Sequence, residues 1–182
     1  MKIVLISANT EQINMPTLPL GLVCVATATE KTGHDVKVVD LISQPDACMV
    51  IGKTLEEFRP DVIGISLRNI DDQCMKNTKF LLDQVKVIVA DCRSFSDAPI
   101  VLGGAGYSIY PEASLAYVGA DMGIQGEGEK AFPALIARIQ ERAGLEGIPG
   151  LYLPGRGLQS PRVFTQDLDG IPLPDHHLWR SC

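Results

Sequence analysis

Five short apolar runs, rich in valine and isoleucine, recur along the chain and alternate with longer segments. They read KIVLIS, DVKVVD, DVIGIS, PIVLGG and ADMGIQ, and they predict strands over residues 2–7, 35–40, 61–66, 99–104 and 120–125. The apolar residues are nearly continuous in each run, which is typical of strands covered on both faces in a parallel sheet.

The segments between these runs carry apolar residues at helical spacing. They predict helices over residues 19–32, 46–58, 72–91, 111–118 and 128–142. Gly33 stands where helices commonly end, and Pro111 stands in a first helical turn. Alternating strands and helices with right-handed crossovers predict an α/β protein. We expect a Rossmann-like (flavodoxin-like), doubly wound parallel sheet of five strands in the order 2-1-3-4-5.

The sequence becomes rich in glycine and proline after Gly144, and its only regular piece there resembles a hairpin within residues 150–164. We therefore expect residues 1–144 to form the domain. Residues 145–182 are expected to form a Gly/Pro-rich hairpin and linker that lead to a further domain outside this chain.

Composition and charge narrow the choice of ligand. The chain has 182 residues, a formal net charge of −6 and only 5% aromatic residues. An acidic protein does not attract nucleic acid or an anionic membrane, and few aromatics are available to stack bases. No apolar run is long enough to span a membrane, and the N-terminal run is too short for a secretory signal. We expect a cytoplasmic protein.

The cysteines give no metal or disulfide pattern. None of the five forms a C-x-x-C pair, and the count is odd. Scattered reduced thiols are the simpler interpretation, and we predict neither metal-ligating nor catalytic residues in this chain.

A ligand of such a sheet is expected at the carboxyl ends of its strands, where the strand order reverses. The loops there read SANTEQINMPTLPLG, SLRNIDDQ, GGAGYSIYPE and QGEGEKAF. The first loop has no phosphate-binding glycine motif. It also lacks the acidic pair of a receiver domain. Neither phosphate binding nor receiver phosphorylation is therefore predicted.

Taken in order, several segments resemble the N-terminal cobalamin-binding domain of cobalamin-dependent radical S-adenosylmethionine (SAM) enzymes. They include LPLGLVCVATATEKTGHDVKVVDL, RPDVIGISL, IVLGGAGYSIYPE, GADMGIQGEGEKAFPALI and LDGIPLPD. The resemblance implies cobalamin as the cofactor of a non-catalytic module, which belongs to an enzyme of the methyltransferase type. It also implies a radical SAM domain later in the same polypeptide, with a [4Fe-4S] cluster and S-adenosylmethionine. The C-x-x-x-C-x-x-C motif for that cluster is absent from these residues.

The wider cobalamin-binding family carries D-x-H-x-x-G after its first strand, S-x-L after its third and G-G after its fourth. Ser66 matches the second motif, although Leu67 follows it one residue early, and Gly103 with Gly104 matches the third. Small side chains at these positions are expected to make a slot for the nucleotide tail of the corrinoid. Residues 1–33 contain no histidine, so the resemblance implies cobalamin bound base-off without a histidine lower ligand.

The resemblance gives a set of expected cofactor-binding residues. We expect Met15, Leu18 and Leu20 to cover the lower face of the corrin. The full set is Asn9, Met15, Leu18, Leu20, Gly21, Ser66, Leu67, Arg68, Asn69, Gly103, Gly104, Ala105, Gly106, Tyr107, Gly126, Glu127 and Gly128.

Simpler interpretations exist for parts of this set. The segment from Gly126 to Glu129 also fits a tight turn that begins a helix, and the Gly103–Gly104 pair also fits a β-bulge. Arg68 either pairs with Asp71 or Asp72 or reaches beneath the corrin.

Two other functions are compatible with the sequence. One is a free-standing corrinoid carrier protein that works with separate methyltransferases. The other is a flavodoxin-like module that binds a flavin or another nucleotide.

Overall fold

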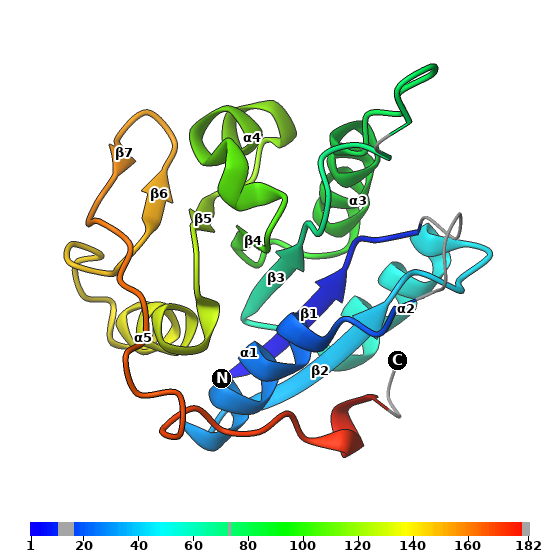
Figure 1. Ribbon diagram of the computed structural model, residues 1–182. Helices are drawn as coiled ribbons and strands as arrows, with labels where there is room; N and C mark the ends of the chain where they lie inside the picture. The colour runs from blue at the N-terminus through cyan, green and yellow to red at the C-terminus, as the bar shows by residue number, and fades with distance from the viewer. Residues whose placement is uncertain (11–16, 73, 180–182) are drawn as a thin grey trace.

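The chain folds around one central sheet, which the computed structural model describes for residues 1–10, 17–72 and 74–179 (Figure 1). The strand order is β2-β1-β3-β4-β5-β6-β7. The bounds are β1 Lys2–Ser7, β2 Asp35–Asp40, β3 Val62–Ser66, β4 Ile100–Gly103, β5 Met122–Ile124, β6 Leu151–Leu153 and β7 Gly157–Leu158. The predicted order of the first five strands is confirmed.

The predicted number of strands is wrong, because the sheet has seven strands and not five. The expected hairpin forms β6 and β7, and β6 pairs antiparallel with β5 through Gly123 and Tyr152. The first five strands are parallel, so β5 would otherwise be an open edge. An exposed edge offers unpaired backbone groups, and the hairpin satisfies them. Whether residue 144 is a domain boundary stays a prediction.

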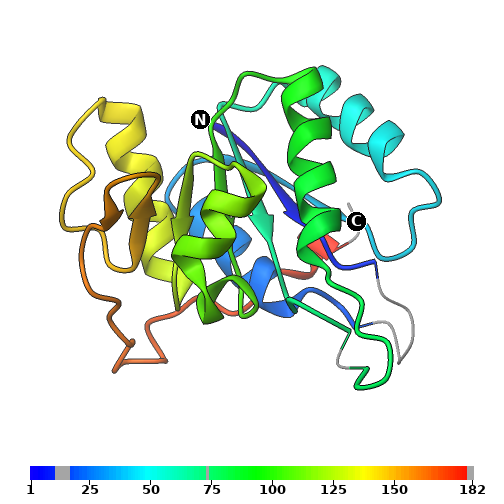
Figure 2. The same cartoon turned by 90° about the horizontal axis from the view of Figure 1, so that it is seen from above.

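Helices cover both faces of the sheet (Figures 1 and 2). Their bounds are α1 Leu20–Lys31, α2 Ala47–Phe58, α3 Leu82–Phe95, α4 Pro111–Val118 and α5 Gly128–Glu141. The α1 and α5 helices pack against one another on one face, with α2, α3 and α4 on the other. None of the helices in the described part of the chain is long and apolar enough to cross a membrane.

The predicted helix over residues 72–91 is wrong at both ends, because α3 spans Leu82–Phe95. The Asp72 carboxylate accepts hydrogen bonds from the backbone N–H groups of Cys74 (3.1 Å) and Lys79 (3.0 Å). A bridge between Asp71 and Phe80 closes the same loop. A short acidic side chain that binds nearby backbone donors favours a turn over a helix, and this delays the start of α3.

The chain returns from the hairpin along the α1–α5 layer as a largely irregular segment, residues 159–178, which we name the C-terminal strap (Figure 1). It runs into a short 3-10 helix, His176–Trp179. Hydrogen bonds hold the strap to the rest of the domain, two of them to α1 and to the residue before α5. The N–H of Thr165 donates to Glu127 at 2.7 Å, and the N–H of Asp175 donates to the Thr27 hydroxyl at 2.9 Å. Leu178 is buried in the core beside α1. The strap is thus part of the packed fold.

Candidate functional site

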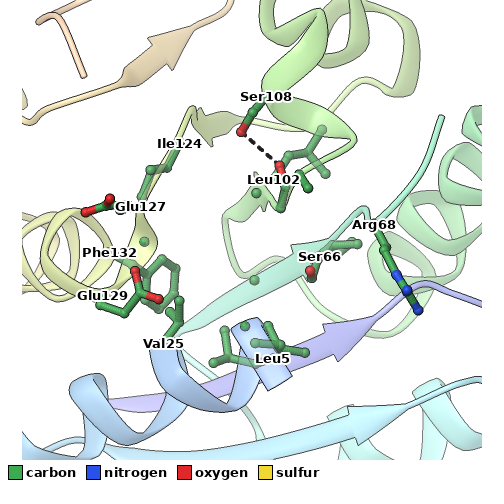
Figure 3. Close-up of a pocket in the computed structure, with 18 of the residues that line it drawn as sticks. Leu5, Val25, Ser66, Arg68, Leu102, Ser108, Ile124, Glu127, Glu129 and Phe132 are labelled. Carbon is green, nitrogen blue, oxygen red and sulfur yellow. Dashed lines mark hydrogen bonds between the residues drawn. The ribbon is translucent and has the colours of Figure 1, made fainter. Parts of the chain in front are cut away.

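A cavity of about 720 Å³ opens at the carboxyl edge of the sheet, between α1 and α5 (Figure 3). Strands β1, β3, β4 and β5 form its floor, and Val25 of α1 and Phe132 of α5 stand on its walls. This is where an open parallel sheet is expected to bind a ligand, and the volume is typical of small-molecule sites.

Gly64, in the centre of β3, lies in the floor of the cavity. Gly64 is in register with Leu5 of β1 and with Val101 of β4. A Cβ at this position would come within 2.4 Å of a Leu5 methyl group and 3.5 Å of the Phe132 ring. The missing side chain therefore lets Leu5 and Phe132 pack closely over β3, and these two side chains form the floor there.

The two adjacent glycines after β4 differ in role. A Cβ on Gly103 would meet no atom closer than the Ile124 carbonyl oxygen at 4.0 Å, and Gly103 lines the cavity. Gly104 has φ +98°, and its Cβ would lie 2.5 Å from the carbonyl oxygen of Leu67. Gly103 thus leaves space free for a ligand, whereas Gly104 is required by the turn.

The β-bulge interpretation of this pair does not hold. Gly103 is in regular parallel register with Ser66 of β3, and Gly104 comes directly after the strand end.

Ser108 ties two loops together at the rim. Its hydroxyl donates to the Gly104 carbonyl at 2.9 Å and accepts from the N–H of Gly126 at 3.0 Å. The Gln125 side chain donates to the Ser108 carbonyl at 3.0 Å. These bonds fix the loop after β4 against the loop after β5, so this wall of the cavity is held in place.

Acidic groups lie on the α5 side of the rim. Glu127 and Glu129 both line the cavity (Figure 3). Hydrogen bonds from Thr165 lower the pKa of the Glu127 carboxyl. Partial burial raises the pKa of the Cys24 thiol, and the nearby charge of Glu129 adds to this effect. The cavity is therefore connected to the C-terminal strap through Glu127.

Arg68 stands at the mouth on the opposite side, directly after Ser66 and Leu67 (Figure 3). Its guanidinium donates to the hydroxyl of Thr17. This contact joins the loop after β3 to the chain entering α1. Arg68 is exposed and lines the cavity, so it is positioned to meet a ligand at the mouth.

The structure brings most of the sequence-predicted residues to this cavity. The residues that line it are Leu18, Leu20, Gly21, Ser66, Arg68, Gly103, Gly104, Ala105, Gly126, Glu127 and Gly128. Met15 lies outside the described residues.

Five predicted residues do not line this cavity. Leu67 and Tyr107 are buried in the core on the α2–α3 face of the sheet. Asn9 and Asn69 border a separate narrow cleft beside α3. Gly106 packs against the backbone of Asn69, where a Cβ would come within 2.9 Å. The two loops cross closely there, so Gly106 supports the shape of the rim.

Sequence reasoning missed the residues of the floor and walls. Leu5, Gly64 and Val101 occupy strand positions that look like ordinary core. A glycine in the middle of a valine- and isoleucine-rich strand is the one signal that could have indicated Gly64. Val25 and Phe132 carried no such signal, because apolar helix residues are normally core.

None of the described residues that line the cavity is a histidine. Within the described residues, His34 lies 3.4 Å from the N-terminal amine, and His177 contacts Glu30 at 3.1 Å. No cluster of three or more histidine, cysteine or acidic side chains in the described part of the chain could hold a metal ion.

The amino-acid sequence matches a known family, and the fold and the position of the cavity are consistent with this match. The sequence model of the B12-binding domain matches residues 6–136. The chain therefore belongs to the B12-binding domain family, and cobalamin is the cofactor that this domain binds.

Relatives with an assigned activity are a methyltransferase and a methylase. The chain is 32% identical to tryptophan 2-C-methyltransferase of Streptomyces laurentii, over 88% of this chain and 27% of that protein. It is 29% identical to hopanoid C-3 methylase of Methylococcus capsulatus, over 83% of this chain and 28% of that protein.

Solved structures of two radical SAM enzymes resemble this chain in fold. The methyltransferase TsrM from Kitasatospora setae, with cobalamin and a [4Fe-4S] cluster bound, superposes with a TM-score of 0.82 and 30% identity, over 94% of this chain and 31% of that chain. The radical enzyme OxsB, with aqua-cobalamin and S-adenosylmethionine bound, shares the fold with a TM-score of 0.75 and 18% identity, over 99% of this chain and 25% of that chain. The chain thus spans about a third or less of the length of these relatives.

The cavity fits the nucleotide tail of a cobalamin. Its closed end is apolar, as an aromatic base requires, and the Gly103 position leaves space that a Cβ would fill. The mouth is more polar, with Ser66, Arg68 and Glu127 around it. Such a rim suits the amide side chains of a corrin ring. A flavin or nucleotide module and a free-standing carrier are not favoured by the comparisons.

Proposed function

We propose that this chain holds cobalamin base-off, with the nucleotide tail in the α1–α5 cavity and the corrin ring across its mouth. The observation that carries the proposal is the unfilled space beside Gly103, continuous with an apolar floor at Gly64. The residues proposed to contact the cofactor are the predicted residues that line the cavity, together with Ser108, Val25 and Phe132. Leu18 and Leu20 are more than half exposed at the mouth, which suits contact with the lower face of the ring.

The proposed state of the cobalt rests on the residues that could reach it. Residues 1–33 contain no histidine, and none lines the cavity. With the tail base inserted between the helices, no imidazole is available below the ring. Leu18 and Leu20 exclude water there, and Arg68 stands beside them at the mouth. Cobalamin bound in this way supplies a low-coordinate cobalt suited to carrying a methyl group.

Electron paramagnetic resonance of the cobalt(II) form tests this proposal. The 182-residue chain is loaded with hydroxocobalamin and reduced by one electron. We expect a spectrum without nitrogen superhyperfine splitting from an axial ligand. Free cobalamin at neutral pH, whose own base is coordinated, is the control. Triplet splitting in the protein-bound spectrum would show a nitrogen ligand and contradict the proposal.

We further propose that the chain serves as the cobalamin module of a radical SAM methyltransferase. The support is the set of methyltransferases of which it matches about a third or less. The chain alone should then leave the upper face of the ring open. Cyanide should exchange the upper ligand quickly, and reduced samples should not cleave S-adenosylmethionine. Slow exchange, or cleavage by this chain alone, would argue against a module.

A further inference from the structure

The residues that line the cavity fall into two groups by burial. Those that are fully buried are all apolar, and Leu5, Gly64, Val101, Ile124 and Phe132 are among them. The polar lining side chains are all exposed or half-buried. They are Thr17, Ser66, Arg68, Ser108, Glu127 and Glu129. The cavity therefore has a polar mouth and an apolar closed end.

The backbone groups at the closed end of the cavity are also hydrogen-bonded within the sheet. Leu5, Gly64 and Val101 form one row across β1, β3 and β4, in parallel register. In such a ladder the N–H and C=O groups bond to the neighbouring strands. The floor thus presents methyl groups and an aromatic ring edge, and its peptide groups are directed along the sheet.

We infer that this closed end selects the corrinoid by its tail base, and that it favours a benzimidazole-type base over a purine such as adenine. The inference rests on the proposed function, in which the tail enters this cavity. Benzimidazoles present a hydrocarbon edge that matches Leu5, Val101 and Phe132. Adenine carries an exocyclic amine and further ring nitrogens.

The physical basis is the cost of burying unpaired polar groups. Adenine bound here would give up its hydrogen bonds to water and find no partner on the apolar floor. One such unsatisfied group weakens binding by about tenfold or more. The expected selectivity is therefore at least about tenfold.

A binding series with the 182-residue chain tests this inference. The probes are hydroxocobalamin, the cobamide with an unsubstituted benzimidazole, the cobamide with adenine, and cobinamide, which lacks the nucleotide tail. Dissociation constants are measured by absorbance titration. We expect both benzimidazole forms to bind at least about tenfold more tightly than the adenine form, and cobinamide to bind more weakly than cobalamin.

A matched pair of variants tests the floor itself. Val101→Thr adds a hydroxyl to the floor at nearly constant volume. Val62→Thr makes the same change in the same core, at a residue that does not line the cavity. We expect the preference for cobalamin over the adenine form to fall by about threefold or more in V101T, because the hydroxyl can partner the purine. The preference should not change in V62T. Thermal unfolding shows that each variant is folded.

The outcomes separate this inference from the proposed function. Equal affinity for cobalamin and the adenine form would overturn the selectivity and leave cobalamin binding intact. Equal affinity for cobalamin and cobinamide would show that the tail does not enter the cavity. Failure of the folded chain to bind any of the four corrinoids would overturn the proposed function as well. If V101T does not fold, the series on the unmodified chain still decides.

Discussion

Two neighbouring glycines show how much one Cβ position decides at the edge of this sheet. Gly103 and Gly104 are chemically identical, and a motif comparison treats them as a pair. The Cβ of the first would enter the cavity, whereas that of the second would collide with the backbone of Leu67. The expectation that both glycines make room for the tail is therefore supported only for Gly103.

Substitution of each glycine by valine should separate these roles. Gly103→Val adds a branched side chain where the tail is proposed to pass, and overpacking of such a site costs about 1–3 kcal/mol. We expect cobalamin affinity to fall at least about tenfold with little change in the melting temperature of the apoprotein. Gly104→Val forces a β-branched residue to φ +98°, which costs about 1–3 kcal/mol before the clash with Leu67 is counted. It should lower the melting temperature.

Absorbance titration gives the affinities, and thermal unfolding of the apoprotein gives the stabilities. If G103V binds cobalamin as tightly as the unmodified chain while remaining folded, the tail does not pass Gly103. If G104V is as stable as G103V, the turn does not depend on the left-handed backbone.

At the scale of elements, the C-terminal strap is fastened to α1 by charge. The His177 ring lies 3.1 Å from Glu30 and 2.9 Å from Asp175. Among the described ion pairs, Asp175 has one other titratable partner, His176, whose ring nitrogen lies 3.5 Å from the Asp175 carboxylate. The hydrogen bonds to Asp175 and Glu30 raise the pKa of His177 above its ordinary value.

This shift predicts a pH dependence of strap docking. Because the pKa of His177 is higher in the folded state, its contribution to stability is complete below the unfolded value of about 6.5. The contribution is lost as the pH rises through the raised folded value. The melting-temperature difference between the unmodified chain and His177→Gln should therefore be largest near pH ~5.5–6 and shrink toward pH ~8.5, a range of about one and a half units on either side of neutrality.

His176→Gln is the control for this experiment, since the contact of His176 is with the strap itself and not with α1. It should leave the pH profile nearly unchanged. Titration of the imidazole protons by NMR gives the pKa of His177 directly, and Glu30→Gln should lower it. A His177 pKa at or below the ordinary value would contradict the proposed role of the His177–Glu30 contact in holding the strap to α1.

At the scale of the whole molecule, the cavity predicts that the stability of the chain depends on the cofactor. Residues of α1, of α5 and of four strands line the cavity, so a bound tail would contact both helices and the strands beneath them. A ligand that binds only the native state at a hundredfold excess over its dissociation constant adds about 2.7 kcal/mol. For a chain of this length, each kcal/mol raises the melting temperature by about 2–4 °C.

Saturating cobalamin should thus raise the melting temperature by about 5–11 °C, and the rise should grow with the logarithm of the cobalamin concentration. Cobinamide at the same concentration should give a smaller rise, because it lacks the tail that fills the cavity. Differential scanning calorimetry of the chain with each corrinoid measures both effects. A melting temperature that does not depend on cobalamin concentration would show that the native state does not bind it.

The pattern of apolar runs was sufficient to predict most of the sheet. The strands over residues 2–7 and 35–40 were predicted with their observed bounds, and so was the helix over 111–118. Buried parallel strands and amphipathic helices leave a periodic record in a sequence. The loop motifs indicated the family in the same way, because they follow one another in a fixed order.

Tertiary structure decided what periodicity does not record. The late start of α3 depends on the hydrogen bonds that the Asp72 carboxylate accepts from the backbone N–H groups of Cys74 and Lys79. The two additional strands depend on an open edge at β5. The cavity floor depends on register, since the alignment of three strands brings Leu5, Gly64 and Val101 side by side in it. The backbone angles of Gly103 and Gly104 likewise decide whether a Cβ at each position would point into the cavity or into the neighbouring backbone. The sequence therefore determined which elements form and which cofactor family they serve, whereas packing between elements determined which glycine opens the cavity and which only turns the chain.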